Sequence, residues 1–188
     1  TSPSSGYVPF IDGLRAIAVV SVILFHLEVR GFGGGFVGVD VFFVISGFLI
    51  SRNILQDLEE GRFSFARFYL RRARRLFPAL FTTLAATFAV GAVVLSPDHL
   101  VSLGRSLAAA LVSGSNILFW QEAGYFDTNA TLKPLLHTWS LSVEEQFYLL
   151  LPITLLLLAR RRWTTTLSVV AGLATASYFL ALHGTAAD

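Results

Sequence analysis

Apolar stretches about 20 residues long recur along this chain, and that is the length an α-helix needs to cross a bilayer. Five of them lie near Phe10–Val29, Phe36–Ile54, Pro78–Ser96, Trp139–Ala159 and Thr164–Leu182. Of the 188 residues, 54% are hydrophobic and 14% are charged, whereas soluble domains carry about a quarter charged residues. We therefore predict an all-α fold, a multi-pass transmembrane bundle with about five full spans.

A sixth segment, from Leu100 to Trp120, is a poor candidate for a full span. Gly104 and Arg105 interrupt it, and so does the polar cluster Ser113–Asn116. Glycine weakens a helix interior, and a charged residue that faces lipid is costly. We predict that this segment is broken or re-entrant.

The placement of arginines predicts how the spans are oriented. Seven arginines lie from the end of the second span to the start of the third: Arg52, Arg62, Arg67, Arg71, Arg72, Arg74 and Arg75. Short loops rich in arginine stay in the cytoplasm, so this connection and the N-terminus are predicted to be cytoplasmic. A second cluster, Arg160–Arg162, lies on the cytoplasmic side only if the segment 100–120 does not cross the membrane fully. Residues 121–138 then lie on the outer side of the cell membrane.

Two ionisable residues of the first span share one helix face. Arg15 and His26 are eleven residues apart, which corresponds to about 16 Å along a helix and nearly a whole number of turns. Ionisable groups inside a span usually mark a functional site, and a histidine can act as a general base at neutral pH. Both residues are therefore candidate catalytic residues. The alternative is that Arg15 snorkels to the interface and His26 marks the end of the helix.

An acid and a run of glycines open the second span. The segment Gly31–Gly38 is glycine-rich, and glycines permit tight turns and close helix contacts. Asp40 follows them and precedes the apolar Val41-Phe42-Phe43, where exposure of a carboxylate to lipid would be costly. Asp40 is a candidate for orienting His26 or pairing with an arginine. A structural ion pair or an interfacial acid is the equally weighted alternative.

The segment 62–78 is predicted to form a cytoplasmic, Arg-rich amphipathic helix that leads into the third span, with Pro78 as a kink or restart. Arg67, Arg71 and Arg74 share one face, whereas Arg72 lies at the edge of the apolar face and would point towards the protein or the headgroups. Such helices commonly bind anionic lipid. Arg72 and Arg75 are better candidates for a phosphate-bearing ligand, because the guanidinium fork matches phosphate oxygens.

Adjacent acids stand at the start of the fifth apolar segment. Glu144 and Glu145 face different directions on a helix, so we predict that at most one faces into the bundle. That carboxylate would act as an acid or base, or orient a histidine. The alternative is an ordinary helix start capped by Ser140 or Ser142, with acids favoured in the first turn. No metal site is predicted, because the chain has no cysteine and its His, Asp and Glu residues lack ligand spacing.

Four segments in this order resemble the acyltransferase-3 family of membrane acyltransferases. They are Tyr7–Ala16 followed by His26, then Gly38–Ile50, Phe68–Pro78 and Trp139–Leu149. Four long motifs in one order are more specific than any single motif, and together they extend from Tyr7 to about Pro152. The chain is most similar to bacterial members that O-acylate envelope sugars, such as O-antigen and peptidoglycan O-acetyltransferases.

The resemblance implies roles for the charged residues. Arg15 and His26 match the family's arginine and histidine of the first span, where the histidine is held to be the catalytic base or the acyl-transfer residue. Asp40 and Glu144 match the acids of the second-span and Trp-Ser-Leu motifs and are included among the catalytic candidates.

A paired-arginine motif before a proline, which falls on Arg72 and Arg75, is thought to engage acyl-coenzyme A on the cytoplasmic side. Arg71 and Arg74 offer a second pair at the same spacing and are also donor-binding candidates.

The resemblance therefore implies an enzyme that moves an acyl group, expected to be acetyl, from acyl-CoA to a hydroxyl of an envelope carbohydrate or glycolipid. The expected partners are acyl-CoA, that acceptor and membrane lipids, with no nucleic acid and no metal. Family members have about ten spans, so residues 1–188 are expected to be the N-terminal part of one acyltransferase domain. From the residues alone, a transporter or flippase and a non-catalytic lipid-binding module remain alternatives.

Overall fold

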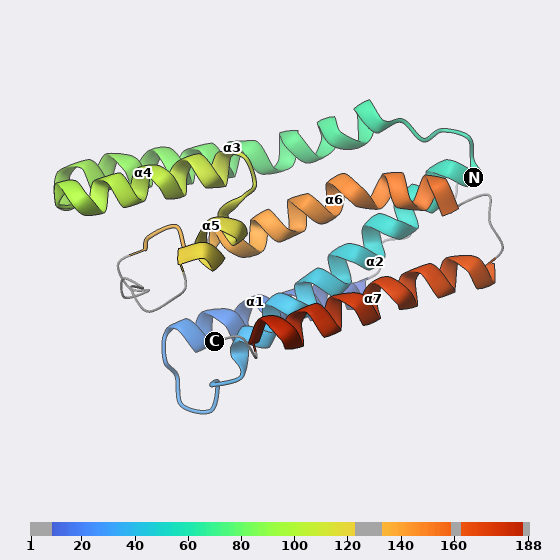
Figure 1. Cartoon of the computed structure of the whole chain (residues 1–188), viewed down its shortest axis with the longest axis horizontal. Helices are drawn as coiled ribbons and strands as arrows, with labels where there is room; N and C mark the ends of the chain where they lie inside the picture. The colour runs from blue at the N-terminus through green and yellow to red at the C-terminus, as the bar shows by residue number, and fades with distance from the viewer. Residues whose placement is uncertain (1–8, 123–132, 159–162, 186–188) are drawn as a thin grey trace.

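The computed structural model describes residues 9–122, 133–158 and 163–185, and the regular structure in these residues is helical (Figure 1). In chain order the elements are α1 (Pro9–His26), the short 3₁₀ helix η1 (Gly35–Val37), α2 (Gly38–Glu59), α3 (Phe65–Val94), α4 (Pro97–Leu111), α5 (Ser115–Glu122), α6 (Thr138–Leu158) and α7 (Trp163–Thr185). Four segments are long and apolar enough to cross a membrane: α1, η1 with α2, α3 and α6. Helix α7 contains a shorter apolar stretch, Thr164–Leu180. The predicted all-α class is confirmed, with four long apolar helices and one shorter one.

Helix α3 is longer than predicted. It runs without interruption from Phe65 to Val94, so of the kink or restart predicted at Pro78, the restart is wrong. Proline removes one backbone donor from the helix, but the surrounding segment is apolar, and backbone groups in such a segment do best when paired within the helix. Ser64 caps the start of α3 by accepting a hydrogen bond from the Arg67 backbone N–H, at 3.4 Å. The Arg-rich segment is thus a rigid extension of the apolar helix.

The doubtful segment 100–120 is broken, as predicted. Helix α4 begins beside the end of α3, and α5 turns back towards the end of the bundle where α4 began (Figure 1). The break falls at Val112–Gly114, where Ser113 has a left-handed backbone conformation with φ of 53°. We call this pair of helices the α4–α5 hairpin.

Buried hydroxyls attach the α4–α5 hairpin to the start of α6. The Thr138 hydroxyl donates to the Ser115 hydroxyl at 2.9 Å, and the Ser115 backbone N–H donates to the Ser142 hydroxyl at 3.2 Å. All three residues are buried. Ser142 is therefore not the N-cap of α6, and Ser140 donates to the His137 carbonyl at 3.1 Å. The capping explanation for these two serines is wrong, because α6 already begins at Thr138.

Gln146 extends this attachment one turn further along α6. Its side-chain amide donates to the Ser113 carbonyl at 2.8 Å and to the Asn116 side-chain oxygen at 2.9 Å. We expect Gln146→Leu to lower the free energy of unfolding by about 1 kcal/mol, because both acceptors lose their donor. The melting temperature of the detergent-solubilised protein measures this loss. Thr154→Val is the matched control, since it removes one exposed side-chain bond from the same helix; an equal loss in both variants would contradict the role of Gln146.

Glycines bring α1 and α2 into close contact. A Cβ at Gly38 would lie 2.5 Å from the Ala18 carbonyl oxygen and 2.8 Å from a Val22 methyl, and a Cβ at Gly35 would overlap the Ser21 carbonyl. Gly35, Gly38 and Ala18 are all buried. The glycine-rich turn predicted from sequence thus lets the start of α2 approach the backbone of α1.

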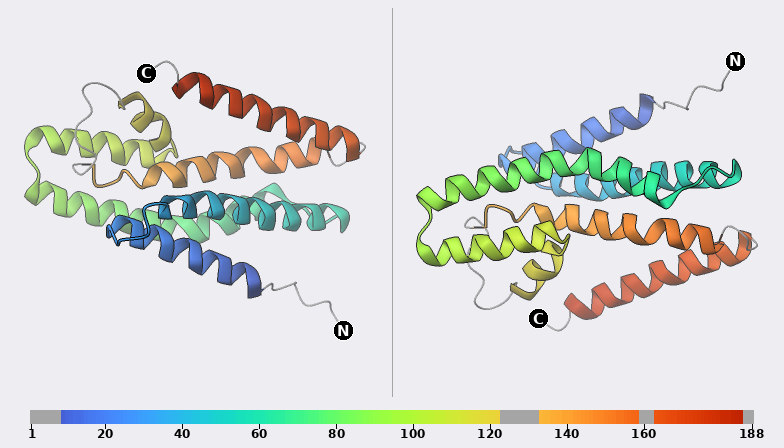
Figure 2. Two further views of the ribbon diagram at one scale, coloured as in Figure 1. Left: turned by 90° about the horizontal axis from the view of Figure 1, so that it is seen from below. Right: turned by 90° about the horizontal axis from the view of Figure 1, so that it is seen from above.

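Several helix ends gather towards the two ends of the bundle (Figure 2). The start of α1, the α2–α3 turn, the end of α6 and the start of α7 lie towards one end of the bundle, and the α1–α2 connection and the α3–α4 turn lie towards the other. Arg160–Arg162 lie outside the described residues. Many outward-facing side chains are apolar, including Val93, which is 86% exposed, and Leu180, which is 72% exposed. Such a surface suits contact with lipid.

Candidate functional site

A cavity of about 270 Å³ lies between α1, α2, α3 and α6, and we call it the central cavity. Its lining residues are Arg15, Phe42, Ser46, Leu49, Ile50, Asn53, Arg72, Arg75, Leu76, Glu144 and Tyr148. Three arginines and one glutamate therefore line one space, and these charged residues come from three different helices. The excess of positive charge favours an anionic ligand.

Arg15 enters the central cavity from α1. Its side chain is partly buried, with a guanidinium nitrogen 3.7 Å from the Asp12 carboxylate one turn earlier and its Cζ 5.9 Å from the centre of the Phe42 ring. The close α1–α2 contact places this first-span arginine opposite the arginines of α3.

Arg72 points into the protein, which is one of the two directions predicted for it. Its Cζ lies 4.0 Å from the centre of the Tyr148 ring and 5.5 Å from that of Phe68. The Tyr148 hydroxyl in turn donates a hydrogen bond to the Glu144 carboxylate one turn earlier on α6. Arg72, Tyr148 and Glu144 thus form a contiguous group in the wall of the central cavity.

A second cavity of about 190 Å³ adjoins the first, and we call it the arginine cavity. Its lining residues are Ile50, Asn53, Ile54, Asp57, Phe68, Arg71, Arg72 and Arg75. Ile50, Asn53, Arg72 and Arg75 line both cavities. An anionic ligand long enough to extend from the central cavity into the arginine cavity would therefore contact these four residues.

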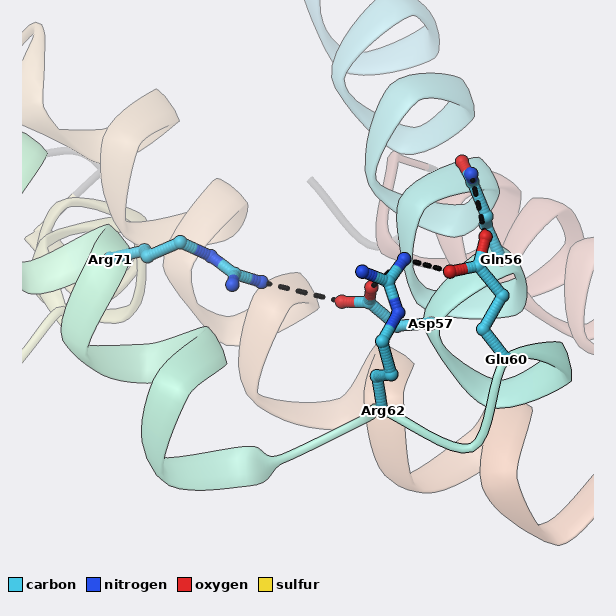
Figure 3. Close-up of polar contacts among 5 residues, drawn as sticks. All are labelled: Gln56, Asp57, Glu60, Arg62 and Arg71. Atoms are coloured by element: carbon cyan, nitrogen blue, oxygen red, sulfur yellow. Dashed lines mark hydrogen bonds and ion pairs between the residues drawn. The ribbon is translucent and has the colours of Figure 1, made fainter. Parts of the chain in front are cut away.

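Arg71 differs from Arg72, Arg74 and Arg75 because it forms an ion pair with Asp57 at the end of α2 (Figure 3). The Asp57 carboxylate lies 3.6 Å from Arg71 and 3.9 Å from Arg62, and Arg62 also pairs with Glu60. Arg71 is therefore already engaged by an acid. Arg74 is exposed and is not among the residues that line either cavity. Of the two arginine pairs left open by the sequence, only Arg72 and Arg75 both line the two cavities.

His26 and Asp40 lie apart from the central cavity. His26 is the last residue of α1, is exposed, and its Nδ1 is 2.8 Å from the Val22 carbonyl oxygen. Asp40 is exposed in the first turn of α2. Among the described residues, no hydrogen bond or ion pair joins His26 to Asp40 or to Glu144. The orientation of His26 by either acid stays a prediction.

The adjacent acids of α6 point in different directions from the helix, about 100° apart. Glu144 lines the central cavity, whereas Glu145 lines a separate cavity of about 20 Å³ between α3, α4 and α6. One Glu145 carboxylate oxygen is buried and has no hydrogen-bond partner among the described residues. The prediction that at most one acid faces into the bundle is wrong, because the α4–α5 hairpin covers the second face of α6.

Three polar residues of the central cavity were not selected by the sequence analysis, namely Ser46, Asn53 and Tyr148. Tyr148 follows Glu144 by four residues, the spacing that places two side chains on one helix face. Asn53 follows Ser46 by seven residues, which again returns to one face. These spacings were the only signals in the sequence that could have placed Tyr148 and Asn53 in the cavity. For metals, no group of three His, Asp or Glu residues in the described part of the chain is placed to hold an ion.

The fold and the cavities together define a class: a helical protein with several membrane-length helices and a positively charged cavity between them. The chain belongs to the acyltransferase-3 family of membrane acyltransferases, since the family model described as an acyltransferase domain matches residues 8–185. The resemblance of the four sequence motifs to this family is thereby confirmed.

Two relatives show what the chain is similar to. It is 41% identical over 158 residues to the peptidoglycan O-acetyltransferase OatA of Listeria monocytogenes, a match that covers 83% of this chain and 25% of that protein. It is 38% identical over 162 residues to the O-acetyltransferase OatA of Staphylococcus aureus, covering 84% of this chain and 26% of that relative. The chain thus spans about a quarter of the length of these relatives. No solved structure matches it.

Proposed function

We propose that this chain forms the donor-binding part of an enzyme that moves an acetyl group from acetyl-CoA to a hydroxyl of an envelope carbohydrate. Family membership and the similarity to a peptidoglycan O-acetyltransferase support the reaction class. The observation that carries the proposal is the central cavity, where Arg15, Arg72 and Arg75 meet Glu144.

The donor's phosphates are assigned to Arg72 and Arg75, which line both cavities. Guanidinium groups bind phosphate oxygens through paired N–H donors, and such charge-assisted bonds are stronger than neutral ones. Both arginines lie in the first half of α3, and α3 starts at the end of the bundle that the positive-inside rule assigns to the cytoplasm. Acetyl-CoA is a cytoplasmic metabolite, so the donor would enter from this end.

The acceptor hydroxyl is assigned to the opposite end, near His26. The imidazole takes the hydroxyl proton, the oxygen attacks the thioester carbonyl, and the carbon–sulfur bond breaks to release coenzyme A, whose thiolate takes up the proton that the imidazolium gives back. Arg15 and His26 are about 16 Å apart along α1. The donor's pantetheine arm would bridge this distance by passing between the helices.

We expect Arg72→Gln to raise the KM for acetyl-CoA about tenfold, because one charge-assisted interaction with phosphate is lost. Acetyl transfer from labelled acetyl-CoA, measured in membranes that contain the full-length protein, tests this. Arg74→Gln is the matched control on the same helix, because Arg74 does not line the cavities. Its KM is expected to stay within about twofold of the wild type. Equal increases in the two variants would contradict the assignment of the phosphates to the cavities.

The same assay separates the alternative functions. A transporter or flippase would move a solute without transferring the labelled acetyl group to an acceptor. A lipid-binding module would likewise transfer no label and would lose membrane binding only when several arginines of α3 are replaced. Covalent label on a carbohydrate acceptor supports the proposed enzyme over both.

A further inference from the structure

Tyr148 is the most deeply buried polar-tipped side chain in the wall of the central cavity. It is 4% exposed, and its ring packs with Ile50, Ile54 and Phe68 in one of the two cores of the bundle. An apolar ring would fill this volume equally well, so the hydroxyl has no packing role. A role for Tyr148 beyond packing must therefore lie in its contacts with two charged side chains, Arg72 and Glu144.

The first contact is with Arg72. At 4.0 Å from ring centre to Cζ, the guanidinium lies against the ring face, which attracts a cation. The N–H donors of a guanidinium point outwards in its own plane, and stacking leaves those donors free for hydrogen bonds. The ring thus holds the arginine in place without occupying the groups that would bind a phosphate.

The second contact is with Glu144. The Tyr148 hydroxyl donates to one carboxylate oxygen from the next turn of α6. A glutamate side chain has several accessible rotamers, and ordering it costs conformational entropy. A fixed donor selects one of those rotamers and holds the carboxylate towards the central cavity, which both residues line.

We propose that Tyr148 is a positioning residue of the donor site, whose ring orients Arg72 and whose hydroxyl orients Glu144. This inference rests on the proposed function, because that function assigns the donor's phosphates to Arg72 and builds the central cavity from arginines and Glu144. The two contacts use different parts of one side chain, so they can be removed separately.

Tyr148→Phe removes the hydroxyl and keeps the ring. We expect kcat to fall about tenfold, because Glu144 loses its fixed rotamer, while the KM for acetyl-CoA stays within about twofold. Tyr148→Leu removes the ring as well, and we expect its KM to rise about fivefold in addition, because Arg72 loses its platform. Both constants are measured with labelled acetyl-CoA in membranes that contain the full-length protein, per amount of folded protein recovered in detergent.

Tyr69 offers a matched control. Its hydroxyl donates to the Leu149 carbonyl at 3.0 Å and so links α3 to α6, as the Tyr148 ring does through Arg72, but Tyr69 does not line the central cavity. We expect Tyr69→Phe to leave kcat and KM within about twofold of the wild type. If Tyr69→Phe lowers kcat as Tyr148→Phe does, the effect is one of helix packing and the proposal is overturned.

A double variant tests the ring contact. If the ring acts through Arg72, Tyr148→Leu raises KM in the wild-type background and changes it little in an Arg72→Gln background. Independent, additive increases would overturn that part of the proposal. An unchanged kcat in Tyr148→Phe, with normal wild-type transfer, overturns the role of the hydroxyl and leaves the proposed function intact. Absence of transfer by the wild type, with its acceptor present, overturns the proposed function itself and with it the inference.

Discussion

His26→Ala is expected to lower acetyl transfer by about 10²- to 10⁴-fold, the contribution that a positioned general base makes to a reaction. His26 ends α1 and is exposed, and its ring contacts the Val22 carbonyl and packs edge-on against Phe25. Its removal therefore leaves no cavity in a packed core, and the protein is expected to fold normally. Transfer from labelled acetyl-CoA in membranes that contain the full-length protein measures the loss.

His99→Ala provides the control for this variant. His99 also lies near a helix end, where its Nδ1 is 2.7 Å from the Ser96 hydroxyl at the start of α4. It lies outside the matched motifs, so its replacement is expected to leave transfer within about twofold of the wild type. Equal transfer by the wild type and His26→Ala would remove His26 from the mechanism.

Gly38→Val is expected to lower the free energy of unfolding by about 3 kcal/mol, because the start of α2 can no longer approach α1. The first added carbon would already lie 2.5 Å from the Ala18 carbonyl oxygen, and a backbone atom cannot swing aside as a flexible side chain can. Separation of the two helices also moves Arg15 away from Arg72 and Arg75. We therefore expect a lower melting temperature in detergent together with weaker acetyl-CoA binding.

Gly13→Val is the matched control, since Gly13 lies in α1 and a Cβ added there would meet no neighbouring atom within 4 Å. Both substitutions place a β-branched residue in a helix, so the difference between them isolates the α1–α2 contact. A similar loss of stability in both variants would show that helix propensity, rather than close packing at Gly38, accounts for the effect.

The helices were predictable because the bilayer imposes their length. A span requires an uninterrupted apolar run, and α1, α2 and α6 coincide closely with such runs. The break near Ser113 was predictable from its polar and glycine residues. The continuity of α3 through Pro78 was not predictable, because a proline that would disrupt a solvated helix is tolerated where the neighbouring backbone groups have no competing water.

The site was predictable where helix geometry alone decides it. The direction of Arg72 followed from its position at the edge of an amphipathic face. The different directions of Glu144 and Glu145 followed from their adjacency on a helix. That both acids nevertheless line cavities depends on where the α4–α5 hairpin packs, and this tertiary contact leaves no periodic signal in the sequence. The role of Tyr148 likewise depends on α3 bringing Arg72 over its ring.

The two sides of α6 have a consequence for judging which relatives are active. Ser142 and Gln146 bind the α4–α5 hairpin, whereas Glu144 and Tyr148 line the central cavity. A relative that had lost the reaction would still need the first two residues to fold. Such a protein would retain a recognisable part of the Trp139–Leu149 motif while its cavity-facing residues diverged. Active and inactive relatives are therefore better distinguished by the cavity-facing positions of this motif, Glu144 and Tyr148, than by sequence identity over the whole motif.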